Sequence, residues 1–224
     1  MKIRGFSVEE WISFPKSFII NWKLFGMKEA FLCPVFIANS VKCKGIKKGS
    51  IVVEAGDKYR GMINIGFGGS LGICANRTGY FIIGDTGRVV FKGTAGLAHG
   101  SSLRVDNGDL IFGNSFSCNK NCFISCSEGI EFGDDVLLGW NVNVRDSDGH
   151  KVYHDSELKP SLKPIRIGKH VWIASEVDIL KGAEVSDGCI IGYRSCVTNR
   201  FEEANCLIAG YPAKVIQHNT TWEK

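Results

Sequence analysis

Aliphatic residues recur at every sixth position through the C-terminal third of the chain. Between Ile167 and Thr198 they stand at Ile167, Ile173, Ile179, Val185, Ile191 and Val197. The fourth residue after each of the first five is small or compact: Val171, Val177, Ala183, Cys189 and Ser195. This period fits neither an amphipathic helix nor the simple alternation of a half-buried strand. It predicts short strands separated by tight corners, with one side chain filling the interior and a small one at each bend.

Three such hexads close one triangular coil, and stacked coils bury a continuous core that no single coil can bury. The predicted fold class is therefore all-β, a parallel β-helix with triangular coils. Weaker hexads run upstream in three registers, at Phe91, Leu97 and Leu103, at Ile111, Ser117 and Phe123, and at Phe132, Leu138 and Val144. The shifts between registers require insertions at the corners, so irregular N-terminal coils are expected.

Residues before about Phe67 have no hexads and are richer in aromatic side chains. We expect residues 1–66 to pack against the first coils and cover their open strand edge. The β-helix is then expected over residues 67–216, and a tail over residues 217–224. The alternative role for the first segment is to extend an acceptor site with sugar-stacking aromatics such as Trp11, Phe14 and Trp22.

Within this segment, "SVEEWISFPKSF" predicts a short helix. Ser7 is its expected cap, and Glu10 three residues later is the expected capping-box partner.

The composition is typical of a soluble globular protein: 44% of the 224 residues are hydrophobic and 22% are charged. The net charge of +4 is modest, and no run of lysine and arginine is dense enough to predict a nucleic-acid partner. The apolar stretches are too short to span a bilayer, and the start of the chain lacks the pattern of a secretory signal. Nine cysteines, an odd number, are expected to stay reduced, which favours a cytoplasmic location.

The run "NVNVRDSDGHKVYHD" leaves the last upstream hexad, and no hexad follows before Ile165. Long excursions from a regular scaffold are usually functional or mobile, so a functional loop is expected at about residues 145–164. It contains His150 close to Asp146 and Asp148. From the residues alone, His150 is either a catalytic base or a solvated loop histidine.

Two further motifs, "KPIRIGKHVWIA" and "LIAGYPAKVI", accompany the hexads. Together they resemble the left-handed β-helix acyltransferases, in the branch of maltose and galactoside O-acetyltransferases and many surface-polysaccharide acyltransferases. The resemblance covers about Ile111 to Ile216 closely and the N-terminal half loosely. It implies a left-handed helix and acetyl transfer from acetyl-CoA to a sugar hydroxyl of a surface polysaccharide or its precursor. It also implies a homotrimer with sites in the clefts between subunits, and no metal.

The resemblance also implies roles for particular residues in the reaction. His150 would be the general base, oriented by Asp148 or Asp146. Turn formation by side-chain hydrogen bonds is the competing role for both aspartates. The backbone amide of Ser175 would stabilise the oxyanion.

In the same way, Trp172 would pack along the pantetheine arm, Thr198 would lie near the end of the coenzyme, and Lys214 would face its phosphates. Asn119 and Asn121 would contact the acceptor, although asparagines also form structural ladders inside β-helices. Ser127, with Glu128 beside it, stands where the family has an acidic residue.

Other functions remain open at this point. An acetyltransferase for amino sugars or antibiotics is one alternative, and a non-catalytic β-helical scaffold is another. A metal-dependent hydratase would need three histidines from neighbouring coils, and His99, His150, His154 and His170 lack that spacing. Cys118, Cys122 and Cys126 are interpreted as small buried core residues, because no Cys-x-x-Cys pair occurs in the chain.

Overall fold

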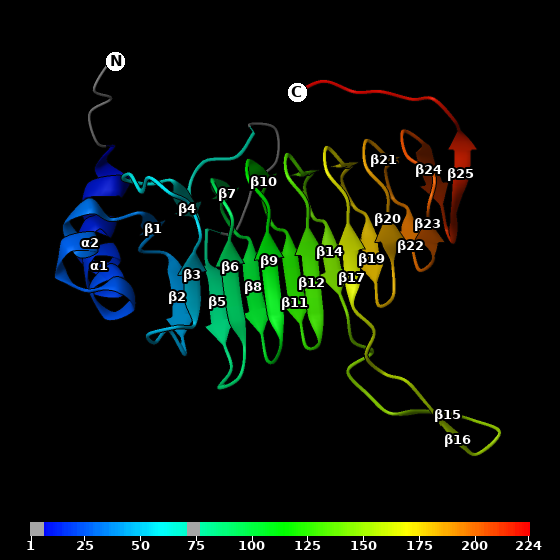
Figure 1. Ribbon diagram of the computed structural model, residues 1–224, viewed down its shortest axis with the longest axis horizontal. Helices are drawn as coiled ribbons and strands as arrows, with labels where there is room; N and C mark the ends of the chain where they lie inside the picture. The colour runs from blue at the N-terminus through cyan, green and yellow to red at the C-terminus, as the bar shows by residue number, and fades with distance from the viewer. Residues whose placement is uncertain (1–6, 71–76) are drawn as a thin grey trace.

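The computed structural model describes residues 7–70 and 77–224, which form a β-helix closed by helices at its N-terminal end (Figure 1). Sheet A contains β1 (Val35–Ile37), β4 (Ile63–Ile65), β7 (Ala95–Leu97), β10 (Phe116–Cys118), β13 (Leu137–Leu138), β18 (Trp172–Ile173), β21 (Ile190–Ile191), β24 (Leu207–Gly210) and β25 (Ala213–Gln217). Sheet B contains β2 (Val41–Lys44), β5 (Gly79–Ile83), β8 (Ser102–Val105), β11 (Phe123–Cys126), β14 (Asn143–Arg145), β19 (Asp178–Leu180) and β22 (Cys196–Val197). Sheet C contains β3 (Ile51–Val53), β6 (Arg88–Phe91), β9 (Asp109–Phe112), β12 (Gly129–Phe132), β17 (Ile165–Ile167), β20 (Glu184–Val185) and β23 (Arg200–Phe201).

Each coil takes one strand from each sheet in the order A, B, C, so β1 to β3 form the first coil and β21 to β23 the seventh. Neighbouring coils pair in parallel. Ile173 lies beside Ile191, exactly three hexads later in the chain. The predicted all-β fold class, the left-handed parallel β-helix, is confirmed.

The core confirms two of the three upstream hexad runs. Buried residues of the first and third runs are Phe91, Leu97, Leu103, Phe132, Leu138 and Val144. The second run, predicted at Ile111, Ser117 and Phe123, is wrong by one position, because the interior is filled by Phe112, Cys118 and Ile124. Side chains alternate across a strand, so a shift of one residue exchanges its two faces. The Phe112 ring decides the register by stacking between Phe91 and Phe132, at centroid distances of 5.1 and 5.6 Å.

The strands of the β-helix begin at Val35, well before the expected start at residue 67. In the first coil, Val35 pairs with Ile63, so the repeat here is longer than the eighteen residues of a regular coil. Insertions at the corners of this coil therefore break the six-residue period, so its hexads cannot be recognised from a fixed spacing in the sequence. At the other end, β25 folds back antiparallel on β24, and the tail begins at residue 218.

The N-terminal helix α1 (Val8–Phe25) and the short helix α2 (Met27–Leu32) precede the first coil. The predicted cap is confirmed, since the Ser7 hydroxyl accepts a hydrogen bond from the Glu10 amide and the Glu10 carboxylate accepts one from the Ser7 amide. Among the described residues, no helix is both long and apolar enough to cross a membrane.

Helix α1 covers the edge strand β1 with polar side chains. The Ser17 hydroxyl accepts a hydrogen bond from the Ile37 amide at 2.9 Å and donates to the Ile37 carbonyl at 3.1 Å. Asn21 makes the same pair of contacts with Val35, at 2.7 Å to the carbonyl and 3.2 Å from the amide. These contacts satisfy backbone groups that an open sheet edge would leave exposed for pairing with another chain.

Candidate active site

A hollow of about 490 Å³ on sheet A brings together three of the residues predicted from the sequence. Asn119 enters it from the corner after β10, Trp172 from β18, and Ser175 from the corner after β18. The first belongs to the fourth coil and the other two to the sixth. Stacking of coils thus gathers residues that lie more than fifty positions apart in the sequence.

The hollow follows from a column of small residues. Gly139, Ala174 and Gly192 occupy the same position, directly after the sheet A strand, in three successive coils. The residue that follows this small one is large in two of the three coils: Trp140 in the fifth and Tyr193 in the seventh. Both line the hollow. These two aromatics were not predicted from the sequence, although their shared place in the hexad was a usable signal.

The Ser175 amide is a free donor in this hollow. In the coil before it, the equivalent amide of Trp140 donates to the Ser175 hydroxyl at 3.0 Å. In the coil after it, the equivalent residue is Tyr193, whose side chain is 60% exposed and offers no nearby hydroxyl. Within the part of the chain that the structure describes, the Ser175 N–H therefore has no acceptor. A preorganised N–H without a partner is suited to a developing negative charge.

The two predicted asparagines have different surroundings. The Asn119 side-chain oxygen accepts a hydrogen bond from the Ser70 amide at 2.8 Å, which leaves its N–H groups for another acceptor. Asn121 does not line the hollow and has a φ of 63°, a left-handed conformation that asparagine tolerates well at corners. For Asn121 the geometry favours a structural role.

His150 lies in the predicted loop, at the corner between sheets B and C, and is exposed. Lys181 holds the base of this loop, because its ammonium group pairs with the Asp148 carboxylate and donates to the Pro160 carbonyl at 2.7 Å. The Asp148 amide also donates to the Ser161 carbonyl at 2.9 Å. His150 follows directly on this fixed base. Within one chain, His150 does not line the hollow on sheet A.

Asp146 is completely buried, and its carboxylate accepts hydrogen bonds from the amides of Ser127, Glu128 and Gly129 at 2.8 to 3.0 Å. It therefore forms the turn between β11 and β12 and does not orient His150. Asp148, engaged with Lys181, does not contact His150 either. Within one chain, neither aspartate orients His150, because the Asp146 carboxylate binds backbone amides and the Asp148 carboxylate pairs with Lys181.

The remaining two predicted coenzyme residues lie apart from the hollow. Thr198 lines a smaller hollow of about 160 Å³ at the base of the loop, together with Lys181 and Arg200. Lys214 is exposed on β25, and no hollow described for this chain includes it.

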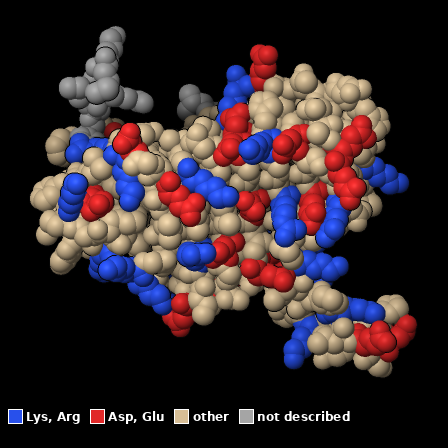
Figure 2. Space-filling view, viewed as in Figure 1, with Lys and Arg blue, Asp and Glu red and all other residues tan. Residues whose placement is uncertain are grey.

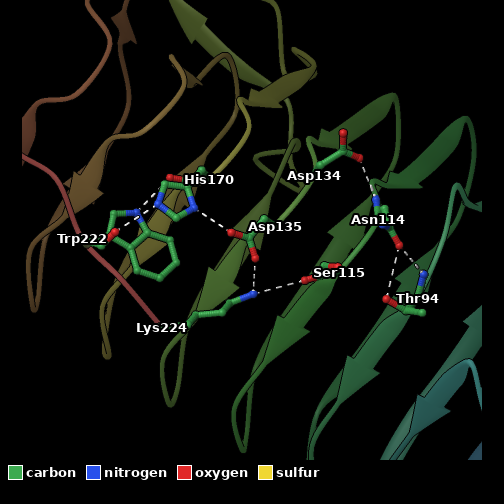
Figure 3. Close-up of polar contacts among 8 residues, drawn as sticks. All are labelled: Thr94, Asn114, Ser115, Asp134, Asp135, His170, Trp222 and Lys224. Carbon is green, nitrogen blue, oxygen red and sulfur yellow. Dashed lines mark hydrogen bonds and ion pairs between the residues drawn. The ribbon is translucent and has the colours of Figure 1, made fainter.

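Contacts of Trp222 and Lys224 hold the C-terminal tail against the side of the β-helix, and we call these contacts the clasp (Figure 3). The Trp222 ring stacks on His170 at 4.3 Å between centroids, and its indole N–H donates to the His170 carbonyl at 2.9 Å. His170 Nδ1 lies 2.6 Å from the Asp135 carboxylate, which also pairs with Lys224. The Trp222 ring is 6.1 Å from Trp172, so the tail supports one wall of the hollow. No local pattern in the sequence indicated this contact between residues 52 positions apart.

The clasp is expected to depend on pH. The hydrogen bond to Asp135 raises the pKa of His170 above its ordinary value, and Lys224, followed by His170, lowers the pKa of Asp135. Because folding raises the pKa of His170, the stability that protonated His170 contributes through Asp135 is complete below the ordinary histidine pKa. It is lost as pH rises through the raised value. The contribution of Asp135 is present above the ordinary carboxyl pKa and is lost as pH falls.

We expect Asp135→Asn to lower the pKa of His170, measured by NMR titration of the imidazole protons. Glu203→Gln, which changes the carboxylate beside His218, is the matched control and should leave His170 unaffected. An unchanged His170 pKa in Asp135→Asn would contradict the clasp as described.

Among the residues that the structure describes, no three histidines come together as metal ligands. His99 lies at the corner between sheets A and B and contacts Glu9 of α1, whereas His170 lies at the corner between sheets C and A. Among the described residues, one group brings three potential metal ligands within 4.8 Å of one another: Glu203, Cys206 and His218 at the end of the β-helix.

The core interpretation of the three central cysteines is confirmed. Cys118, Cys122 and Cys126 are free and buried, and burial raises the pKa of the Cys126 thiol. A buried thiol with a raised pKa is a poor nucleophile, which fits a packing role.

No family model matches the chain. Over 142 residues it is 30% identical to the putative lipopolysaccharide biosynthesis O-acetyl transferase WbbJ of Escherichia coli, covering 56% of this chain and 72% of the relative. It is 33% identical over 122 residues to the galactoside O-acetyltransferase of the same organism, covering 54% of this chain and 56% of the relative. Among solved structures, the polySia-specific acetyltransferase NeuO matches with a TM-score of 0.42 at 22% identity, covering 82% of this chain and 87% of that one.

Proposed function

Because this chain belongs to the hexapeptide-repeat O-acetyltransferases, we propose that it transfers an acetyl group from acetyl-CoA to a sugar hydroxyl of a surface polysaccharide or its precursor. The observation that carries this proposal is the relation to WbbJ, which extends over 72% of that enzyme. The hollow on sheet A supports it, since a hollow lined by small residues and by the aromatic side chains of Trp140, Trp172 and Tyr193 suits the pantetheine arm. The free cysteines fit a reaction in the cytoplasm.

In the proposed reaction, acetyl-CoA and the sugar bind together. His150 removes the proton of the hydroxyl as its oxygen attacks the thioester carbonyl. The carbonyl oxygen becomes an oxyanion, which the Ser175 N–H stabilises. The tetrahedral intermediate collapses with cleavage of the carbon–sulfur bond, and the imidazolium returns its proton to the leaving thiolate. Asn119 holds the acceptor beside the reacting carbonyl.

This mechanism needs more than one chain, and we propose a homotrimer in which the loop of one copy reaches the hollow of its neighbour. The separation of His150 from the hollow within one chain supports this arrangement. The hairpin of β15 (Val152–His154) and β16 (Glu157–Lys159) projects away from the coils (Figure 1). Its side chains Tyr153 and Leu158 are 60% and 55% exposed, as expected for a surface that a partner covers.

Trp172→Ala is expected to weaken acetyl-CoA binding by about tenfold, because an aromatic wall of the hollow is removed; that factor equals about 1.4 kcal/mol. Isothermal calorimetry with acetyl-CoA measures the change. Tyr80→Ala removes an aromatic side chain of similar exposure on sheet B and should bind as the wild type does. If folded wild-type protein did not bind acetyl-CoA, a non-catalytic scaffold would be the better interpretation.

The acceptor class is tested by the product. Acetylated sugars formed by the enzyme should lose the acetyl group in mild hydroxylamine, which cleaves esters and spares amides. A hydroxylamine-resistant product would instead indicate an N-acetyltransferase acting on an amino sugar or antibiotic.

A further inference from the structure

Helices α1 and α2 expose many of their apolar side chains, although Ile20 and Leu24 of α1 pack into the core. Exposed residues at helical spacing along α1 are Val8, Ile12, Pro15, Ile19 and Trp22, and α2 adds Met27, Phe31 and Leu32. Val8, Ile12, Trp22, Met27 and Phe31 are each more than half exposed. A surface helix of a globular protein normally turns such a stripe toward the core. We call this outward face the apolar stripe.

The orientation of α1 follows from its polar residues. Ser13, Ser17 and Asn21 recur every four residues, are fully buried, and satisfy the backbone edge of the first coil. Because that edge requires hydrogen-bonding partners, the helix must turn its polar face inward. The apolar stripe is thereby held outside by specific hydrogen bonds, and a contiguous patch of this kind marks a binding surface.

Charge indicates what the apolar stripe binds. Residues 1–60 contain eleven lysines and arginines against five aspartates and glutamates, a net charge of +6, whereas residues 61–224 contain sixteen against eighteen. The excess lies in the segments that flank the two helices, because residues 8–32 carry three lysines and three glutamates. Lys23 and Lys28 are exposed on the two helices, and Figure 2 shows further basic side chains near this end of the molecule, with acidic side chains among them. Both acidic residues of α1 are already engaged, Glu9 with His99 and Glu10 in the cap.

We propose that α1 and α2 form a peripheral docking surface for anionic phospholipid bilayers. Tryptophan, phenylalanine and leucine on one face with lysine at its margins is the composition of helices that lie in the headgroup region of a membrane. Protein interfaces, in contrast, are depleted of lysine. The basic side chains attract the anionic surface, and the apolar stripe enters the boundary between headgroups and acyl chains.

This docking surface lies at the end of the β-helix opposite to β24 and β25 (Figure 1). The hollow on sheet A spans the fourth to the last coils, so it stays open when the helices meet a membrane. Membrane docking by α1 and α2 does not require acetyl transfer. If the proposed function also holds, docking brings the enzyme to lipid-linked acceptors.

Flotation of the full chain with vesicles tests the proposal. Wild-type protein should float with vesicles of phosphatidylcholine containing 30% phosphatidylglycerol and much less with phosphatidylcholine alone, and added salt should reduce the binding. The triple variant Ile12→Gln, Ile19→Gln, Trp22→Gln should bind at least tenfold more weakly. Ile216→Gln, which changes a side chain of similar exposure (58%) at the opposite end, is the matched control and should float like the wild type.

A second readout does not depend on the folding of the triple variant. Vesicles with brominated acyl chains should quench tryptophan fluorescence of the wild type more than that of Trp22→Phe. Wild-type protein that stays unbound with anionic vesicles would overturn the proposal. So would a triple variant that changes the oligomer mass by light scattering without any wild-type vesicle binding, because the stripe would then be an interface between copies.

Discussion

Replacing His150 with alanine is expected to lower the rate of acetyl transfer by about 10²–10⁴-fold, the usual contribution of a general base. A sugar hydroxyl is a weak nucleophile at neutral pH, so the step slows when its proton has no acceptor. Acetyl-CoA binding should stay within about twofold of wild type, since His150 removes a proton from the acceptor and does not line the hollow. Steady-state kinetics and calorimetry measure the two quantities separately.

His154→Ala is the matched control for this prediction. His154 lies on the same loop, in β15, and its side chain is 71% exposed. Its loss should leave the transfer rate close to that of wild type. Retention of more than a tenth of the wild-type rate by His150→Ala, or an equal loss in His154→Ala, would exclude His150 as the base.

Asp146→Ala is expected to lower the free energy of unfolding by about 2–4 kcal/mol. The substitution leaves three backbone amides between Ser127 and Gly129 without their carboxylate acceptor, and each buried donor without a partner costs about 1–3 kcal/mol. The estimate is below the full sum because these residues are partly open to water. Urea denaturation with a linear extrapolation measures the change.

Asp148→Ala gives the comparison on the same loop. Its ion pair with Lys181 is partly exposed, with side chains 31% and 25% accessible, and such pairs contribute about 0–1 kcal/mol. We therefore expect the two aspartates to differ clearly in stability. Equal unfolding free energies for Asp146→Ala and Asp148→Ala would show that the buried carboxylate does not stabilise the turn.

How far the sequence predicts the site depends on the distance over which its residues act. Trp172 and Ser175 were predicted because one continuous motif carries them: Trp172 lies within "KPIRIGKHVWIA" and Ser175 follows it directly, and both line the hollow. Trp140 and Tyr193 escaped notice, since they belong to different coils and meet only through the stacking register. Trp222 was missed for the same reason, because its contact with His170 spans 52 residues.

The sequence by itself determined the fold class of this protein and the capped N-terminal helix, because both arise from interactions within a few residues. A six-residue period specifies where the chain must turn and which side chain enters the core, and Ser7 with Glu10 specifies where a helix begins. Tertiary structure alone decided the start of the first coil and the register around Phe112. It also decided that Asp146 serves a turn and that the apolar face of α1 points outward. Each of these depends on contacts between coils, or between the helix and an open sheet edge, whose partners are brought together only by folding.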